Sequence, residues 1–171
     1  MWEAIAAAAA AESPLWGDAL RPEAKQDRQP VFSPLAPSAH ALGLETIYEG
    51  YLVHYGRSRV FAPADRDTAL LLGDYLYAHG LVRIAEARDV GAVSDLAELI
   101  SLCAQSRAAG RDGDGPAWAA TSASLGAGGL DLARRALRER GDSSILDAVA
   151  RSVAGDEAVD SALAAHGRFV G

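Results

Sequence analysis

The spacing of hydrophobic residues along the chain predicts helices and no strands. Apolar side chains between Leu42 and Tyr55 recur at helical intervals and stop at Gly56, so we expect a first core helix there. A second apolar stripe runs from residue 70 to residue 84. It is broad, which indicates a helix with neighbours on several sides. Ser38 and Pro63 stand where these two helices are expected to begin.

The rest of the chain continues the helical pattern. We expect a third core helix over residues 92–109, which ends before Gly110, and a polar turn over residues 111–116. Shorter helices are predicted over residues 118–125, 130–140 and 156–166, together with one that Asp142 or Ser143 caps. No window alternates strictly between apolar and polar residues. The fold class is therefore predicted to be all-α, as an orthogonal or bundle-like array.

Residues 1–37 are expected to form an N-terminal segment, and residues 38–171 one α-helical domain. The alanine run within residues 1–12 is similar to the apolar part of a signal peptide, but Glu3 lies close to it and no basic residue precedes it. We therefore expect a short alanine-rich helix. Residues 13–37 hold five prolines, whose rings remove amide donors and disfavour the helical conformation. This stretch is predicted to be an extended arm.

Composition and charge narrow the class of protein further. A chain of 171 residues of which 50% are hydrophobic is long enough for one domain with a core. The net charge of −7 argues against a nucleic-acid-binding surface, which needs clustered cations. No segment is apolar over the length that a membrane span requires. Cys103 is the only cysteine, so no intrachain disulfide forms and the cytoplasm is the expected location.

The run from Asp67 to Glu86, with its Gly73-Asp74 step, resembles the helix that follows the first aspartate-rich motif of trans-isoprenyl diphosphate synthases, the polyprenyl synthetase family. Aligned on that step without gaps, Gly56 falls on the glycine of the Arg-Arg-Gly sequence of that family. His54 and Tyr55 then fall on its two arginines, and Glu45, Thr46 and Glu49 fall on its three aspartates. The resemblance spans residues 42–107. It implies an isoprenoid-synthase-like helical bundle of reduced size.

The departures from the family pattern affect the chemistry that the family performs. Ionising an allylic diphosphate needs Mg²⁺ ions held by carboxylate oxygens. Glu45 and Glu49 lie one helical turn apart on the same face, which makes them the candidate Mg²⁺ ligands, but Thr46 carries no charge. His54 and Tyr55 cannot replace two guanidinium groups on a diphosphate. The second aspartate-rich helix has no counterpart, so no catalytic residue is assigned.

Other side chains are candidates for binding a substrate. Arg57 and Arg59 follow the first core helix and are predicted phosphate ligands if a prenyl diphosphate binds. Tyr48, Tyr51 and Tyr55 lie among five tyrosines within 30 residues, which either pack in the core or line an isoprenoid cavity. Gly73 and Gly80 destabilise an isolated helix, so their presence predicts the close approach of another helix.

Three functions are compatible with this sequence. The first is a non-catalytic member of the isoprenyl diphosphate synthase group, which acts as a regulatory or partner subunit of a full-length prenyl synthase or by self-association. The second is a terpenoid or prenyl diphosphate-processing enzyme with a divergent Mg²⁺ site. The third is an α-helical interaction module without an isoprenoid role, in which the proline-rich arm makes the contact.

Overall fold

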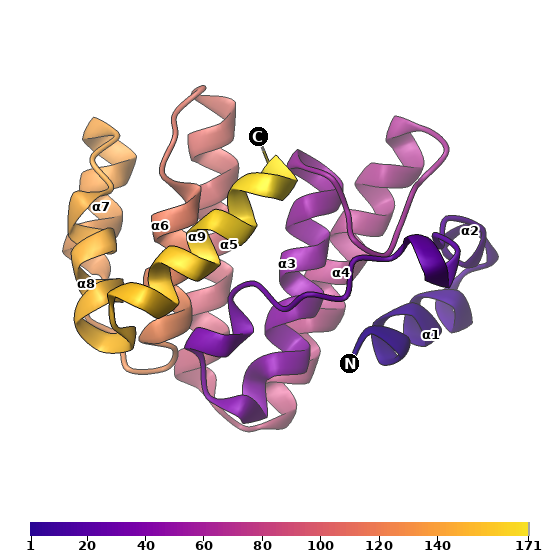
Figure 1. Ribbon diagram of the computed structural model, residues 1–171, viewed down its shortest axis with the longest axis horizontal. Coiled ribbons are helices and arrows are strands. Elements are labelled where there is room, and N and C mark those ends of the chain that lie inside the picture. The colour runs from indigo at the N-terminus through magenta and orange to yellow at the C-terminus, as the bar shows by residue number, and fades with distance from the viewer. Residues whose placement is uncertain (171) are drawn as a thin grey trace.

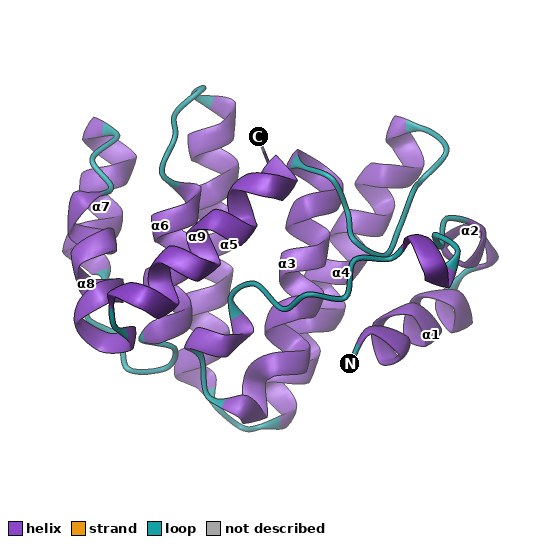
Figure 2. Cartoon of the chain, in the orientation of Figure 1, coloured by secondary structure: helices purple, strands orange, loops and turns teal. Residues whose placement is uncertain are grey.

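The computed structural model describes residues 1–170, and in this range the chain is built from helices and the loops that join them (Figures 1 and 2). One isolated bridge between Leu20 and Phe61 is the only β pairing of the described residues. The predicted all-α class is confirmed. The α-helices are α1 (Trp2–Glu12), α2 (Pro14–Asp18), α3 (Ala41–Tyr55), α4 (Arg66–Glu86), α5 (Val90–Ala108), α6 (Asp114–Ala123), α7 (Asp131–Arg140), α8 (Ser144–Ala154) and α9 (Asp156–Val170).

Helices α3 and α4 form a closely packed antiparallel pair at the centre of the fold. Glycines face each other at two levels. A Cβ atom on Gly80 would lie 2.9 Å from the carbonyl oxygen of Gly43, and one on Gly50 would lie 2.9 Å from that of Gly73. Real Cβ atoms do not come this close to a backbone, so these positions need glycine. The close approach predicted from Gly73 and Gly80 is confirmed.

The second half of the chain packs around α6. This helix contacts α5, α8 and α9, and α9 runs diagonally across the others to reach α3 (Figure 1). The main hydrophobic core lies between these elements, with the Trp118 side chain of α6 only 1% exposed. α7 and α8 are strongly amphipathic and cover the outer side of this half. The core therefore reaches from α3 to α8 without a break.

The N-terminal segment packs against the bundle. Trp2 and Ile5 of α1 are buried and join Leu72 and Leu76 of α4 in a second apolar cluster. The segment that was predicted to be an extended arm contains α2, whose start is capped by the Ser13 hydroxyl. Beyond α2 the backbone pairs with residues 60–62 and then crosses α3. The alanine-rich helix is present as predicted.

Several helix boundaries differ from the prediction. α3 begins at Ala41 because residues 38–40 form a 3-10 turn, and Ser38 makes no capping bond. α4 begins at Arg66, where the Asp65 carboxylate accepts a hydrogen bond from the Thr68 amide at 2.7 Å. α6 begins at Asp114, four residues earlier than expected, because a proline in the first turn of a helix costs no hydrogen bond. The left-handed glycine that ends α5, Gly110, is confirmed.

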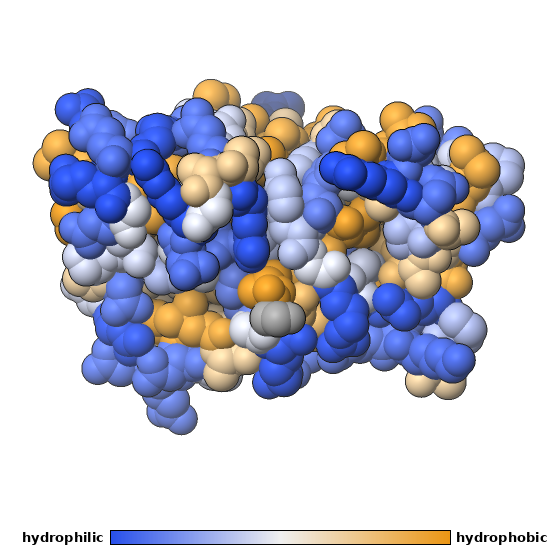
Figure 3. All heavy atoms as spheres, turned by 90° about the horizontal axis from the view of Figure 1, so that it is seen from above, coloured by the Kyte–Doolittle hydropathy of each residue, from blue (hydrophilic) through white to orange (hydrophobic). Residues whose placement is uncertain are grey.

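The accessible surface of the chain is 8010 Å², close to the roughly 8,000 Å² expected for a folded monomer of this size. Viewed from the end that carries the C-terminus, this surface is mostly hydrophilic, with small apolar areas between the polar side chains (Figure 3). Within residues 1–170, no helix is both long enough and apolar enough to cross a membrane.

Candidate functional site

The residues that the sequence suggested as metal ligands lie in the interior of the protein, around Arg59. Its guanidinium group contacts a Glu45 oxygen at 2.7 Å and a Glu49 oxygen at 2.9 Å. The side chains of all three residues are 0% exposed. The two glutamates lie one turn apart on α3, as predicted, and the loop after α3 turns Arg59 back between them. One cation is therefore shared by two buried anions.

Backbone amides complete the hydrogen bonding of this cluster. Glu45 Oε1 accepts hydrogen bonds from the amides of Val31 and Ser33, both at 3.0 Å. Glu49 Oε1 accepts one from the Val60 amide at 2.9 Å. Both carboxylates are thus held by the guanidinium group and by the chain segments that cross α3. Buried charges are tolerated when they are paired and hydrogen-bonded in this way.

Aromatic rings enclose the guanidinium group of Arg59. Its central carbon lies 4.5 Å from the ring centre of Trp2 and 4.9 Å from that of Tyr48. Burial alone would lower the pKa of Arg59, but Glu49 and Glu45 outweigh this effect and raise the pKa above its ordinary value. Arg59 therefore stays charged inside the core.

This arrangement bears directly on the predicted Mg²⁺ and phosphate ligands. The oxygens of Glu45 and Glu49 that face the interior are already used by Arg59 and by backbone amides. Thr46 bonds to the Leu42 carbonyl of its own helix at 2.7 Å. Among residues 1–170, no group of three or more His, Cys, Asp and Glu side chains is placed to hold a metal ion. Arg59 is buried, so its guanidinium group does not face a surface where a phosphate would arrive.

Arg57 lies in a different place from Arg59. It is exposed just after the end of α3, and its guanidinium carbon lies 5.1 Å from the ring centre of Phe169 on α9. It also lines a pocket of about 320 Å³ together with Arg21, and Leu52 and Phe61 are among the apolar side chains there. The structure therefore separates the two arginines that the sequence placed together.

Tyr48 and Tyr51 belong to the core and form a second polar network there. The Tyr48 hydroxyl lies 2.9 Å from His166 Nδ1. The Tyr51 hydroxyl contacts Asp114 and accepts a hydrogen bond from Arg107 Nη2 at 2.7 Å. Burial raises the pKa of both phenols, and Asp114 raises that of Tyr51 further. Both tyrosines are therefore neutral at physiological pH and serve the packing of α3 against α6 and α9.

His166 is the most perturbed base of this network. Burial lowers its pKa from 6.5 to about 4, against an opposing effect of Asp114. Its Nε2 atom is buried without a hydrogen-bond partner among the described residues. The imidazole is therefore neutral at physiological pH.

The remaining tyrosines are less buried than Tyr48 and Tyr51. Tyr55 is half-buried beside Tyr51, with 5.4 Å between the ring centres. Tyr75 stacks on Trp16 at 4.2 Å and on His79 at 5.2 Å, at the contact between α4 and the N-terminal segment. Tyr77 stacks on His54 at 5.1 Å. Tyr75 thus packs in a different cluster from the other four tyrosines, so the five do not share one site. The three predicted isoprenoid-binding residues act as core or edge residues in this conformation.

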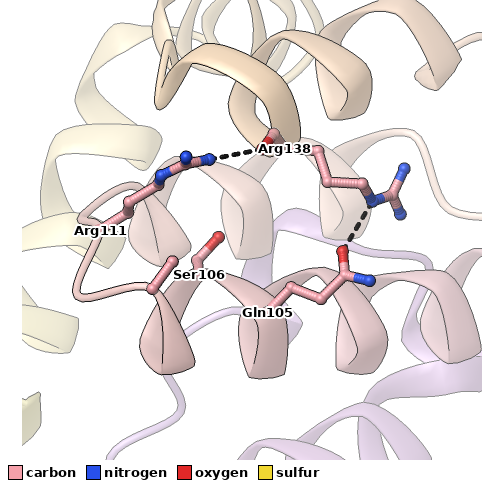
Figure 4. Close-up of a pocket in the computed structure, with 5 residues that line it drawn as sticks. Gln105, Ser106, Arg111 and Arg138 are labelled. Carbon is pink, nitrogen blue, oxygen red and sulfur yellow. Dashed lines mark hydrogen bonds between the residues drawn. The ribbon is translucent and has the colours of Figure 1, made fainter.

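Sequence reasoning missed the residues that line a second pocket, of about 220 Å³, between the end of α5 and the end of α7 (Figure 4). Its polar lining comes from Gln105, Ser106, Arg111 and Arg138. It also missed the roles of Arg107 and Asp114, because Asp114 was assigned to a surface turn. Nothing in the local sequence marks these residues, since they meet only after α5, α6 and α7 have packed.

No family model matches this chain, and no curated protein and no solved structure matches it either. The resemblance to isoprenyl diphosphate synthases therefore stays a prediction from the sequence.

Proposed function

We propose that the protein is a non-catalytic relative of isoprenyl diphosphate synthases that acts as a regulatory or partner subunit of a prenyltransferase. The observation that carries this proposal is the ion pairing of Arg59 with Glu45 and Glu49. In the alignment suggested by the sequence, these two glutamates stand where the family holds its catalytic metal ions. A guanidinium group from the same chain takes the place of the cation there.

Electrostatics explains why this exchange is incompatible with catalysis. A Mg²⁺ ion needs nearly octahedral oxygen ligands and brings two positive charges to the diphosphate. Arg59 brings one charge, and both glutamates neutralise it. This cluster therefore has no net positive charge to balance a departing diphosphate. A chain with this arrangement keeps the helical scaffold and acts on a prenyltransferase by binding to it, not by catalysis.

The outer face of α4 supports a role in contact. We define this α4 face by Leu71, Ala78, Val82 and Ala85, which lie within one narrow stripe of the helix and are all exposed. Leu71 is 61% exposed and Val82 is 56% exposed. Near the end of this stripe, Ala85 also lines a mostly apolar pocket of about 190 Å³ with Val90. Exposed apolar stripes of this kind serve as protein contacts.

A matched pair of variants tests the proposal. Val82→Glu places a charge in the α4 face, and Val153→Glu places the same charge on α8, where the valine is 57% exposed. Each tagged full-length variant is expressed in the native host, and retained proteins are identified by mass spectrometry. We expect the unmodified chain and Val153→Glu to retain a prenyl synthase, and Val82→Glu to lose at least 90% of it.

The alternative hypothesis, that the chain is itself a prenyl diphosphate-processing enzyme, is tested separately. The purified chain, alone and with the retained partner, is incubated with farnesyl diphosphate and Mg²⁺, and the products are separated by chromatography. We expect no turnover by the chain alone and a changed product length or rate for the partner. Retention of an unrelated protein through the α4 face would favour an interaction module without an isoprenoid role. A chain that stays monomeric and leaves every prenyl synthase of the host unaffected would refute the proposal.

A further inference from the structure

The pocket between α5 and α7 carries an arrangement of donors that the proposed function does not use. Ser106 and Gln105 lie in the last turns of α5, Arg111 lies in the loop that leads to α6, and Arg138 lies near the end of α7 (Figure 4). The pocket has a volume of about 220 Å³, which corresponds to roughly seven waters at ~30 Å³ each. No carboxylate lines it.

The side chains of this pocket have hydrogen-bond donors that are not used within the described part of the protein. Arg111 uses one N–H on the Arg138 carbonyl, at 2.5 Å, and makes no ion pair with a carboxylate of residues 1–170. Gln105 accepts a hydrogen bond from Arg138 Nε through its oxygen, at 2.9 Å, so its NH₂ group remains free to donate. The Ser106 hydroxyl points into the gap between the two helices (Figure 4). These three residues together offer guanidinium, amide and hydroxyl donors to one small volume.

The helix ends at the pocket do not cancel its surplus of hydrogen-bond donors. The C-terminus of a helix is partially negative because its last carbonyls lack partners. Here the Gln105 and Ser106 carbonyls accept hydrogen bonds from the amides of Ala109 and Arg111, at 3.0 and 2.9 Å. The Arg138 carbonyl is covered by the Arg111 side chain. The carbonyls of the three lining residues Gln105, Ser106 and Arg138 therefore all have hydrogen-bond partners.

Arg111 is the arginine of this pocket that no carboxylate of the described residues pairs with. Glu98 pairs with Arg138 and neutralises it. The fork of an arginine matches two oxygens of a phosphate group and makes stronger hydrogen bonds to it than to a neutral acceptor. We propose that this pocket binds a phosphate group, either as the free ion or as the end group of a small ester, with Arg111 as the main ligand and Ser106 and Gln105 as further donors.

Isothermal titration of the full-length chain with inorganic phosphate, at an ionic strength held constant with chloride, tests this site. Arg111→Gln removes the charge, and Arg140→Gln removes an exposed arginine at the end of α7 that does not line the pocket. We expect saturable binding by the unmodified chain and by Arg140→Gln within a factor of two. Arg111→Gln should bind roughly tenfold more weakly, as expected for the loss of a charge-assisted pair.

A second variant keeps the test interpretable if Arg111→Gln does not fold. Ser106 is buried and makes no hydrogen bond to the other side chains drawn in Figure 4, so Ser106→Ala should leave the melting temperature nearly unchanged and weaken phosphate binding roughly three- to tenfold. Equal binding of glycerol phosphate identifies an ester end group as the ligand, and binding of inorganic phosphate alone identifies the free ion. The proposal is overturned by the absence of saturable binding, by equal losses in Arg111→Gln and Arg140→Gln, or by acetate binding as tightly as phosphate. None of these results depends on the α4 face or on Arg59.

Discussion

Replacing Arg59 with methionine is the sharpest test of how the core is held together. Methionine has a similar length but no charge, so Arg59→Met leaves Glu45 and Glu49 buried without their cation. Removing one partner of a buried ion pair costs about 3–5 kcal/mol. The lost contact with the Trp2 ring adds roughly 0.5–2 kcal/mol. Since domains are commonly stable by only about 5–15 kcal/mol, we expect Arg59→Met to lose a large part of the free energy of unfolding at pH 7.

The pH dependence distinguishes charge from packing. Without Arg59, Glu45 and Glu49 bury two carboxylates that no cation balances, and such burial is costly only while the carboxylates are charged. The destabilisation should therefore be greatest at neutral pH and smaller at acidic pH. A loss of packing alone would be the same at every pH.

Urea unfolding followed by circular dichroism at pH 7 and pH 5 measures this effect. The matched control is Arg59→Met combined with Glu45→Gln and Glu49→Gln, which keeps the oxygens that accept the backbone amides and removes both charges. We expect this triple variant to recover most of the loss. The reasoning is refuted if Arg59→Met costs less than about 1 kcal/mol at pH 7, or if its cost does not change between the two pH values.

Three further outcomes follow from other parts of the structure. Gly80→Ala should cost about 1–3 kcal/mol in urea unfolding because its Cβ meets the Gly43 carbonyl, whereas Gly167→Ala on α9, which meets nothing within 4 Å, should stabilise the chain by up to about 1 kcal/mol. His166 stays neutral in the folded state down to pH about 4, so between pH 6.5 and 4 the unfolded chain takes up a proton that the folded chain does not. The unfolding free energy should therefore fall by up to about 3 kcal/mol over this window, and by clearly less in His166→Gln. Burial raises the pKa of the Cys103 thiol, so a thiol reagent should modify it only as fast as the chain unfolds, and rapid modification of the folded protein would contradict its burial.

The features that the sequence predicted correctly depend on local spacing. Helical periodicity identified α3, α4 and α5, and the glycines of α4 indicated a close partner helix, which is α3. The spacing of Glu45 and Glu49 placed both carboxylates on one helical face. Each of these inferences involves residues within one element, where the period of 3.6 residues decides which side chains lie together.

The features that it did not predict depend on contacts between distant segments. Arg57 and Arg59 look equivalent in sequence, but only Arg59 turns into the core, because the segment after α3 pairs with residues 19–21. The Tyr48–His166 contact joins residues 118 positions apart. Asp114 looked like a turn residue, and its burial against Tyr51 becomes visible only when α6 packs on α3. Patterns within one helix carry no information about such pairings.

The position of Arg59 connects the stability of the protein to its proposed lack of catalysis. The guanidinium group that pairs with Glu45 and Glu49 also donates to the Gln29 carbonyl at 3.0 Å and lies against Trp2. It therefore ties the N-terminal segment to the bundle as well as neutralising the two glutamates. Removing Arg59 would free the carboxylates and at the same time loosen the segment that covers them. For this reason, a single substitution should yield a destabilised protein rather than a working Mg²⁺ site, and Mg²⁺ should raise the melting temperature of neither the unmodified chain nor Arg59→Met.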